Sequence, residues 1–354
     1  MPSWNSKPMG GVVLTGATGF VGSEVLARFL ERSDRHVYAL VRASDDEAAA
    51  ARLPKHERLT AVAADIERPG LGLEQRKADA IAEEASTVVH CAASVSFDYD
   101  LDKSRRVNVG GTRHVLELAE RCAERGDGLE RLSYVSTAYV AGAHRGLFEE
   151  DQLDVGQDFR NPYEQSKFEA ETLIRERADG LPLQVLRPSI VVGDRRTGQT
   201  SSFNVLYGPL KAFARGRLPA IPGRRSSPVD IVPVDYVADA VQELSSNGSD
   251  GTFHLVAGEN ATTVGKLLKL ASRTLRKPAP RVLPPTLYRR VAHPLLRKKY
   301  VALRRSEMYF PYFDMRVRFA ARRFPPAPPV ETYFDRLIEF AQAARWGGRR
   351  ITPA

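Results

Sequence analysis

Tyr163 and Lys167 are the two side chains of this sequence best suited to moving a proton. They stand four residues apart, so on a helix they share one face. An ammonium group close to a phenol lowers the pKa of the phenol from about 10, and such a phenol can give or take a proton in catalysis. Thr137, which follows Ser136 at the end of an apolar run, offers a hydroxyl that could hold a carbonyl oxygen. These residue types together predict acid–base chemistry at a carbonyl or hydroxyl carbon.

A glycine-rich turn near the N-terminus predicts a second kind of site. Residues 14–22 read LTGATGFVG, with glycines at 16, 19 and 22. The first glycine permits a tight turn from strand to helix, the second lets a pyrophosphate approach the backbone, and the third allows the helix to pack closely on the strand. The N-terminus of the following helix attracts phosphate. We therefore expect a dinucleotide to contact Thr15, Gly16, Thr18, Gly19, Phe20, Val21 and Gly22.

The residue that ends the next strand pattern indicates which dinucleotide binds. Folds that prefer NAD place an acid there for the ribose hydroxyl, whereas an arginine accommodates the 2′-phosphate of NADP. In this sequence Arg42 follows Leu40-Val41, and no acid occurs before Asp45. We therefore predict NADPH as the cofactor. Asp65 and Ile66, after the third strand pattern, are predicted to contact the adenine.

Strand and helix patterns that alternate along the first half of the chain are expected to position these residues. Expected strands cover 12–14, 36–41, 59–64, 87–91 and 132–136, and expected helices cover 20–31, 74–84 and 105–124. Such alternation requires parallel strands joined by right-handed crossovers. The predicted fold class is therefore α/β, with a doubly wound, Rossmann-like parallel sheet.

The second half of the chain predicts a smaller domain that interleaves with the first. Asn161 and Pro162 predict the start of a helix that reaches Ala178. A strand is expected over 183–186, residues 230–241 are expected to return to the main sheet, and Thr262 or Thr263 is expected to cap a helix ending near Leu275. The predicted NADP-binding domain covers 1–195 and 228–245. A mostly helical substrate-binding domain with a basic cap covers 196–227 and 246–354.

Composition excludes several classes of protein. The chain has 354 residues, 43% hydrophobic and 27% charged, and lacks any apolar run long enough to span a membrane. Its two cysteines, Cys91 and Cys122, form no disulfide framework, and no Cys/His cluster predicts a metal site. The first residues lack the apolar core of a secretion signal. A cytoplasmic location is expected.

The positive charge is concentrated in the last quarter of the chain. Residues 273–350 hold 19 Lys/Arg against 5 Asp/Glu, within a net charge of +9 for the whole chain. No nucleic-acid-binding motif accompanies this charge, so nucleic acid is not the expected partner. Within it, residues 287–305 read LYRRVAHPLLRKKYVALRR. This basic segment is either a solvated structural cap or a docking surface for an acidic carrier helix, coenzyme A phosphates or an anionic membrane, so peripheral membrane contact stays open.

Taken together, several motifs resemble those of the extended short-chain dehydrogenase/reductase family. They are TGATGFVG, the turn His90-Cys91-Ala92-Ala93, Asn108-Val109 with Gly111-Thr112, YVSTAY and YEQSK. The resemblance covers nearly the whole chain. It implies that Tyr163 is the general acid, that Lys167 binds ribose and lowers the pKa of Tyr163, and that Thr137 holds the carbonyl oxygen. It further implies that Asn108 supports a water relay near the lysine, and that Ala92, Ala93, Pro188 and Ile190 line the cofactor.

Other stretches resemble the thioester reductase and fatty acyl-CoA reductase branch of that family. They include HVYALVRASDDEAAAARL, ADIERPGLGL, VVHCAASVSFDYDL and LRPSIVVGD. This resemblance implies NADPH-dependent reduction of an acyl group carried on coenzyme A or an acyl carrier protein, to an aldehyde or further to an alcohol. The C-terminal part does not match the substrate domains of carrier-bound reductases. A dehydrogenase or epimerase acting on a steroid-like or sugar-like hydroxyl, and an NADP(H) sensor without turnover, are the alternative interpretations.

Overall fold

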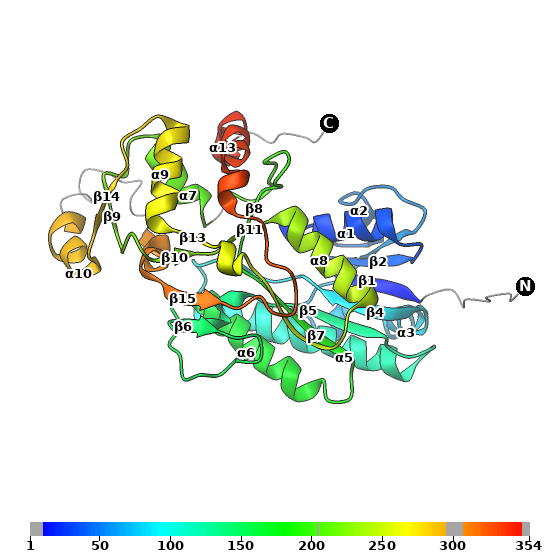
Figure 1. Cartoon of the computed structure of the whole chain (residues 1–354). Helices are drawn as coiled ribbons and strands as arrows, with labels where there is room; N and C mark the ends of the chain where they lie inside the picture. The colour runs from blue at the N-terminus through cyan, green and yellow to red at the C-terminus, as the bar shows by residue number, and fades with distance from the viewer. Residues whose placement is uncertain (1–9, 204, 295–306, 349–354) are drawn as a thin grey trace, which may run out of the picture. The chain divides into compact units, whose positions relative to one another are not determined.

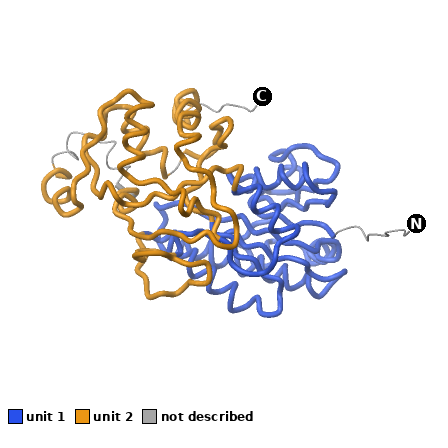
Figure 2. The backbone as a smooth tube through the Cα atoms, viewed as in Figure 1, with its two compact units in different colours: residues 1–140, 161–187, 237–253 blue, residues 141–160, 188–236, 254–354 orange. Residues whose placement is uncertain are grey.

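The computed structural model describes residues 10–203, 205–294 and 307–348 (Figure 1). The chain divides into two compact units (Figure 2). Unit 1 consists of residues 1–140, 161–187 and 237–253, and unit 2 consists of residues 141–160, 188–236 and 254–354. Because the chain passes repeatedly between them, neither unit corresponds to one continuous stretch of sequence.

A seven-stranded sheet forms the centre of unit 1. Its order is β12-β7-β5-β4-β1-β2-β3, and each neighbouring pair from β3 to β7 is parallel. The predicted doubly wound parallel sheet is therefore confirmed. The strands are β1 (Gly11–Thr15), β2 (Val37–Val41), β3 (Leu59–Ala63), β4 (Ala85–His90), β5 (Arg131–Val135), β7 (Leu183–Pro188) and β12 (Gly251–Leu255).

Helices cover both faces of this sheet, which explains why β1 and β4 are buried along their whole length. Figure 1 shows α3, α5 and α6 along one face and α1 and α8 along the other. Apolar residues of α3, α5 and α6 pack on the sheet in one core cluster, which includes Ile81, Leu116 and Ile174. The helices are α1 (Phe20–Arg32), α2 (Asp46–Ala50), α3 (Gln75–Glu84), α4 (Leu101–Arg105), α5 (Gly111–Glu124), α6 (Pro162–Arg177) and α8 (Val234–Asn247).

The order of strands reverses between β1 and β4. From β1 the chain builds outward through β2 and β3, and then returns to add β4 on the other side. Thr15 at the end of β1 pairs with His90 at the end of β4. In open parallel sheets, ligands bind at the carboxyl ends of the strands at such a reversal.

The helix predicted over 105–124 is interrupted. A π-helical turn, Arg106–Gly110, separates α4 from α5. The sequence pattern of this stretch is continuous, so periodicity did not reveal the change of winding. π-Turns inside helices are frequent at functional sites, and this one contains Asn108.

Unit 2 combines helices with pairs of short strands. The parallel pairs are β8 (Ile190–Val192) with β11 (Ile231–Pro233), β9 (Ala220–Pro222) with β14 (Arg281–Leu283), and β6 (Arg145–Phe148) with β15 (Arg316–Phe319). β10 (Pro228–Val229) pairs antiparallel with β13 (Thr262–Thr263). The helices are α7 (Tyr207–Ala214), α9 (Val264–Leu275), α10 (Pro285–Leu287) and α13 (Phe334–Ala343). Thr263 caps α9 as predicted.

The units differ from the predicted boundaries for reasons that lie in long-range pairing. Residues 141–160 belong to unit 2, where β6 pairs with β15 from near the C-terminus. Of residues 230–241, which were predicted to return to the main sheet, residues 237–241 return to unit 1 as part of α8, whereas β11 pairs with β8 in unit 2. Most of the basic segment, which the sequence left open as a structural cap or a docking surface, lies outside the described residues, at 295–306.

Candidate functional site

The glycine turn is packed so tightly that two of its glycines have no substitute. Gly16 has a φ of +77°, and a Cβ there would lie 2.7 Å from the backbone nitrogen of Ala92. A Cβ on Gly22 would lie 2.1 Å from the carbonyl oxygen of Gly16. Gly19 precedes α1 with no side-chain cap, and the first turn of that helix contains no acid. The free amides at this helix N-terminus form a cradle suited to a phosphate group.

Thr15 connects this cradle to the end of β4. Its hydroxyl lies 2.7 Å from Nδ1 of His90 and accepts a hydrogen bond of 3.2 Å from the backbone N–H of Ala92. Burial, and next the charge of Lys167, lower the pKa of His90 to about 3. His90 is therefore neutral at physiological pH. It serves to hold the strand ends together, and Ala92 lies against the glycine turn.

Two arginines, rather than one, lie beside the end of β2. Arg42 is 76% exposed, and its Nη1 lies 3.5 Å from Oε1 of Glu67. Arg52 donates a hydrogen bond of 2.6 Å to the carbonyl oxygen of Arg42 and one of 3.3 Å to the hydroxyl of Thr18. Arg52 was not predicted, because it lies ten residues further along the chain and is brought back by the short helix α2. Asp45 caps that helix.

The predicted adenine contacts lie on the loop after β3. The side chain of Asp65 accepts a hydrogen bond from the backbone N–H of Glu67, and the carbonyl oxygen of Ile66 lies 2.8 Å from Nδ1 of His114. A Cβ on Gly111, at the start of α5, would lie 2.9 Å from the side chain of Ile66. The loop is thus held on α5, and its contact with adenine stays a prediction.

Tyr163 lies in the first turn of α6, next to the end of β5. Asn161 accepts a hydrogen bond from the N–H of Glu164 and Pro162 begins the helix, as predicted. The hydroxyl of Thr137 hydrogen-bonds the phenol of Tyr163. Burial raises the pKa of Tyr163 to about 12, although the hydrogen bond to Thr137 opposes this rise. The ring of Phe97 lies 5.9 Å from the ring of Tyr163, centroid to centroid.

Lys167 is buried one turn further along the same helix. Its Nζ donates a hydrogen bond of 2.9 Å to the carbonyl oxygen of Val135 and lies 4.2 Å from the ring centroid of Tyr134. Burial lowers the pKa of Lys167 to about 7, partly offset by the charge of Glu171. The predicted lowering of the Tyr163 pKa is not found in this structure, because burial of the phenol dominates. The sequence placed the two residues correctly on one helix but did not predict their burial.

Asn108 contacts the loop after β4 and the helix that bears Tyr163. Its Oδ1 accepts a hydrogen bond from the N–H of Ser94, and its Nδ2 donates to the carbonyl oxygen of Ser94 and to the hydroxyl of Ser166. The hydroxyl of Thr112 donates to the Asn108 carbonyl. The side chain thus fixes the loop against α6. The water relay implied by the family resemblance stays a prediction.

A buried ionic network below Lys167 was missed from the sequence. Glu171 is fully buried, with an Oε1 that lies 2.6 Å from Nη2 of Arg187, which is also fully buried. Arg175 lies 2.8 Å from the same carboxylate, and the hydroxyl of Ser136 donates to it at 2.6 Å. Burial alone would raise the pKa of Glu171, but Arg187 lowers it below its usual value. Glu171 follows Lys167 by one turn, which is the only signal that the sequence offered.

This network also separates the roles of the two adjacent hydroxyls after β5. Ser136 is bound to the buried carboxylate of Glu171, whereas Thr137 contacts Tyr163. Ser136 is thus engaged by Glu171, and the role of Thr137 at the carbonyl oxygen stays a prediction. Pro188 ends β7 and Ile190 begins β8 in unit 2. Their role beside the nicotinamide stays a prediction.

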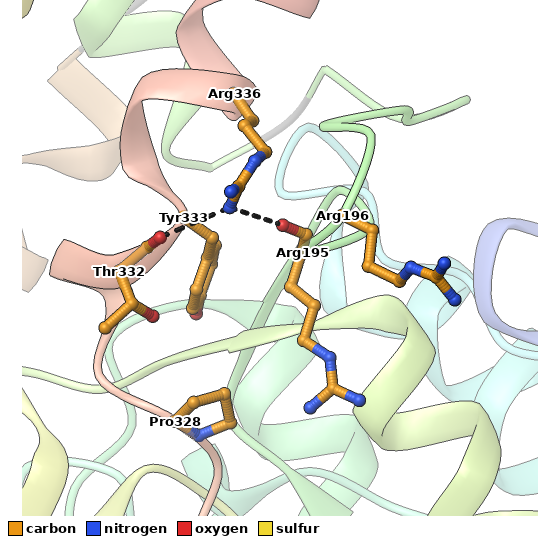
Figure 3. Close-up of a pocket in the computed structure, with 6 residues that line it drawn as sticks. All are labelled: Arg195, Arg196, Pro328, Thr332, Tyr333 and Arg336. Carbon is orange, nitrogen blue, oxygen red and sulfur yellow. Dashed lines mark hydrogen bonds between the residues drawn. The ribbon is translucent and has the colours of Figure 1, made fainter.

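Two pockets lie within the described part of unit 2. The first, of about 510 Å³, is lined by Arg195, Arg196, Pro328, Thr332, Tyr333 and Arg336 (Figure 3). Arg336 donates to the carbonyl oxygens of Arg195 and Thr332, and Arg195 forms a 2.8 Å ion pair with Asp235. Both arginines are thus engaged within the protein. The second pocket, of about 490 Å³, is lined by segments that include β6, β15 and α10.

Within the described ranges no cluster of His, Cys, Asp or Glu could hold a metal ion. Over the same residues, none of the helices combines the length and apolar character needed to cross a bilayer.

Comparisons with known proteins agree with this arrangement. Residues 14–241 match the NAD-binding family described as Male sterility protein. The chain is 32% identical over 284 residues to nonribosomal peptide synthetase asaC of Aspergillus flavus, and the matched region covers 72% of this chain and 27% of that protein. It is 27% identical over 277 residues to fatty acyl-CoA reductase wat of Drosophila melanogaster, which covers 65% of this chain and 53% of that protein. The chain thus spans only part of each relative.

A solved structure extends the likeness to nearly the whole chain, including the C-terminal part for which the sequence showed no match. The terminal R domain from the myxalamid PKS-NRPS biosynthetic pathway is similar with a TM-score of 0.82 and 26% identity, over 96% of this chain and 92% of that chain. The resemblance stated from the motifs is confirmed. The chain belongs to the male sterility protein family of NAD(P)-binding oxidoreductases, and its fold is that of the extended short-chain dehydrogenases/reductases.

Proposed function

We propose that this chain is an NADPH-dependent reductase of acyl thioesters carried on coenzyme A or on an acyl carrier protein. The observation that carries the proposal is the placement of Tyr163 and Lys167 one turn apart on α6, with Lys167 bound to the end of β5 and Thr137 beside the phenol. The names of the similar proteins, a fatty acyl-CoA reductase and a peptide synthetase, support a thioester substrate. Unit 2 is assigned to substrate binding.

The residues around the glycine turn fit a dinucleotide. A Cβ at Gly16 or Gly22 would fill space that the backbone needs, and the uncapped start of α1 offers amides to a pyrophosphate. Arg42 and Arg52 would hold the 2′-phosphate that distinguishes NADPH from NADH. When bound, the reduced nicotinamide supplies a hydride for the carbonyl carbon of the substrate.

Thr137 and Tyr163 are assigned to the carbonyl oxygen. Their hydroxyls donate hydrogen bonds to this oxygen as negative charge develops on it, and preorganised donors of this kind contribute about 10²–10³ each in rate. With a pKa of about 12, Tyr163 is protonated at neutral pH and can transfer its proton to the oxygen. The resulting hemithioacetal breaks its carbon–sulfur bond, so that an aldehyde and a free thiol leave the site.

Lys167 is assigned to the return of a proton to Tyr163. Its pKa of about 7 allows the amine to give and take a proton at neutral pH. Glu171, held by Arg187, keeps a negative charge next to the amine and so favours its protonated form. Asn108 positions the loop after β4 against α6.

The test is a panel of acyl-CoA and acyl-carrier thioesters of varied chain length, with NADPH or NADH as reductant. We expect a loss of absorbance at 340 nm as NADPH is oxidised, and an aldehyde that can be trapped as a hydrazone. The amount of NADPH consumed per thiol released then distinguishes reduction to the aldehyde from reduction to the alcohol. NADP⁺ reduction in the presence of alcohols, steroids or sugar nucleotides, with no thioester turnover, would contradict the proposal.

A further inference from the structure

The second pocket of unit 2 is strongly basic. Four arginines line its volume of about 490 Å³, namely Arg145, Arg160, Arg289 and Arg316, together with two histidines. The one acid in the lining, Asp314, already forms a 3.0 Å ion pair with Arg224, which does not line the pocket. The lining therefore contains more basic than acidic side chains.

Two of these arginines are direct neighbours in a sheet. β6 and β15 pair in parallel, and their register places Arg145 beside Arg316. Among the described residues, neither side chain has a carboxylate partner, and both are exposed. Like charges at neighbouring positions on paired strands destabilise the sheet. An anion bound between the two guanidinium groups would remove this repulsion.

The remaining lining is apolar. Pro222, Pro285, Phe310 and Pro311 line the pocket beside the arginines, and the buried ring of Tyr288 contacts Phe310 at 5.5 Å between centroids. A ligand that combines an anionic group with a partly apolar chain would satisfy both parts of the lining, whereas a free inorganic anion would contact only the charged part.

The same pocket lies at the start of the basic segment. Arg289 belongs to residues 287–305, and the sequence of residues 295–306 contains five Lys/Arg and no Asp/Glu.

We propose that this pocket binds the phosphate of the phosphopantetheine arm that carries the acyl group, an inference that rests on the proposed function. On a carrier protein the phosphate of the arm is a diester with one charge, and in coenzyme A it is part of a pyrophosphate; in both, its free oxygens can accept hydrogen bonds from two guanidinium groups. The pantetheine chain next to the phosphate combines methylene and amide groups and fits the apolar lining. Coenzyme A and carrier proteins share this arm.

Direct binding tests the proposal without catalysis. Calorimetry on the full chain is expected to show that 4′-phosphopantetheine binds at least about tenfold more tightly than pantetheine, because charge-assisted hydrogen bonds to the phosphate are lost in pantetheine. The double variant Arg145→Gln with Arg316→Gln should lose this preference. Arg318→Gln is the matched control, because Arg318 lies on the same exposed face of β15 but does not line the pocket. Equal binding of the two ligands by the unmodified chain, or equal loss in Arg318→Gln, would overturn the proposal.

Kinetics then separate the two sources of the arm. With the same acyl group, the double variant should raise KM about tenfold or more for acyl-phosphopantetheine and leave acyl-pantetheine unchanged. A rise for acyl-CoA alone, for the acyl carrier protein alone, or for both supports the site and identifies its natural donor. A rise for acyl-pantetheine as well, with an unchanged thermal unfolding curve, would overturn it. Preferential phosphopantetheine binding without turnover of any thioester would contradict the proposed function and leave the phosphate site supported.

Discussion

Removal of the two guanidinium groups beside β2 should convert a preference for NADPH into indifference between NADPH and NADH. Arg42 is exposed, and within the described chain its ion pair is with Glu67. Arg52 contacts the carbonyl oxygen of Arg42 and the hydroxyl of Thr18. The substitutions Arg42→Ala and Arg52→Ala, alone and together, therefore probe the 2′-phosphate contact that we assign to these side chains.

The expected magnitude follows from their exposure. An exposed ion pair such as Arg42–Glu67 contributes about 0–1 kcal/mol to stability, so Arg42→Ala should fold normally. A charge-assisted hydrogen bond to a phosphate contributes about 1.5–3 kcal/mol, which is about 10- to 100-fold in affinity. NADH lacks the 2′-phosphate, so its affinity should change by less than about twofold in Arg42→Ala.

Fluorescence titration of both cofactors measures the effect. Arg76→Ala is a matched control, because Arg76 is an exposed arginine on α3 and removes the same charge from unit 1. If Arg42→Ala weakens NADPH and NADH equally, Arg42 supports the fold rather than the phosphate. If Arg76→Ala weakens NADPH as strongly as Arg42→Ala does, the effect reflects net charge, and the assignment is refuted.

Three further predictions concern α6. Tyr163→Phe should lower kcat by about 10²–10⁴ with NADPH affinity unchanged in the same titration, and an unchanged kcat would show that another group supplies the proton. Since burial lowers the pKa of Lys167 to about 7, the unfolded chain binds more protons than the folded chain above pH 7. The free energy of unfolding, measured by urea titration, should therefore rise between pH 7 and pH 9 by up to about 1.4 kcal/mol per pH unit, and Lys167→Met should lack this rise. The same pH dependence in both proteins would refute the prediction. Glu171→Gln should lower the free energy of unfolding by about 3–5 kcal/mol, because it leaves Arg187 buried without its partner. Glu169→Gln, which breaks a surface ion pair with Arg105, should lower it by about 0–1 kcal/mol. Similar losses of stability for both variants in urea unfolding would contradict a stabilising role for the buried pair.

Local patterns in the sequence were sufficient for the parts of the protein that depend on near neighbours. The glycine spacing in residues 14–22 predicted the turn between β1 and α1, because only glycine tolerates the φ of Gly16 and the close approach at Gly22. Asn161-Pro162 predicted the start of α6, and with it the common face of Tyr163 and Lys167. The alternation of strands and helices predicted a parallel sheet, because crossovers between parallel strands require intervening helices.

The tertiary structure decided everything that depends on contacts between distant segments. Arg52 reaches Thr18, and Arg187 neutralises Glu171, through folding that no local period encodes. Burial is likewise a property of the folded chain, so the sequence predicted a lowered pKa for Tyr163 where the structure raises it. The pairing of β6 with β15 places Arg145 beside Arg316, although 170 residues separate them in the chain. A sequence determines which side chains are available, and only the folded chain determines which charges are left without a partner.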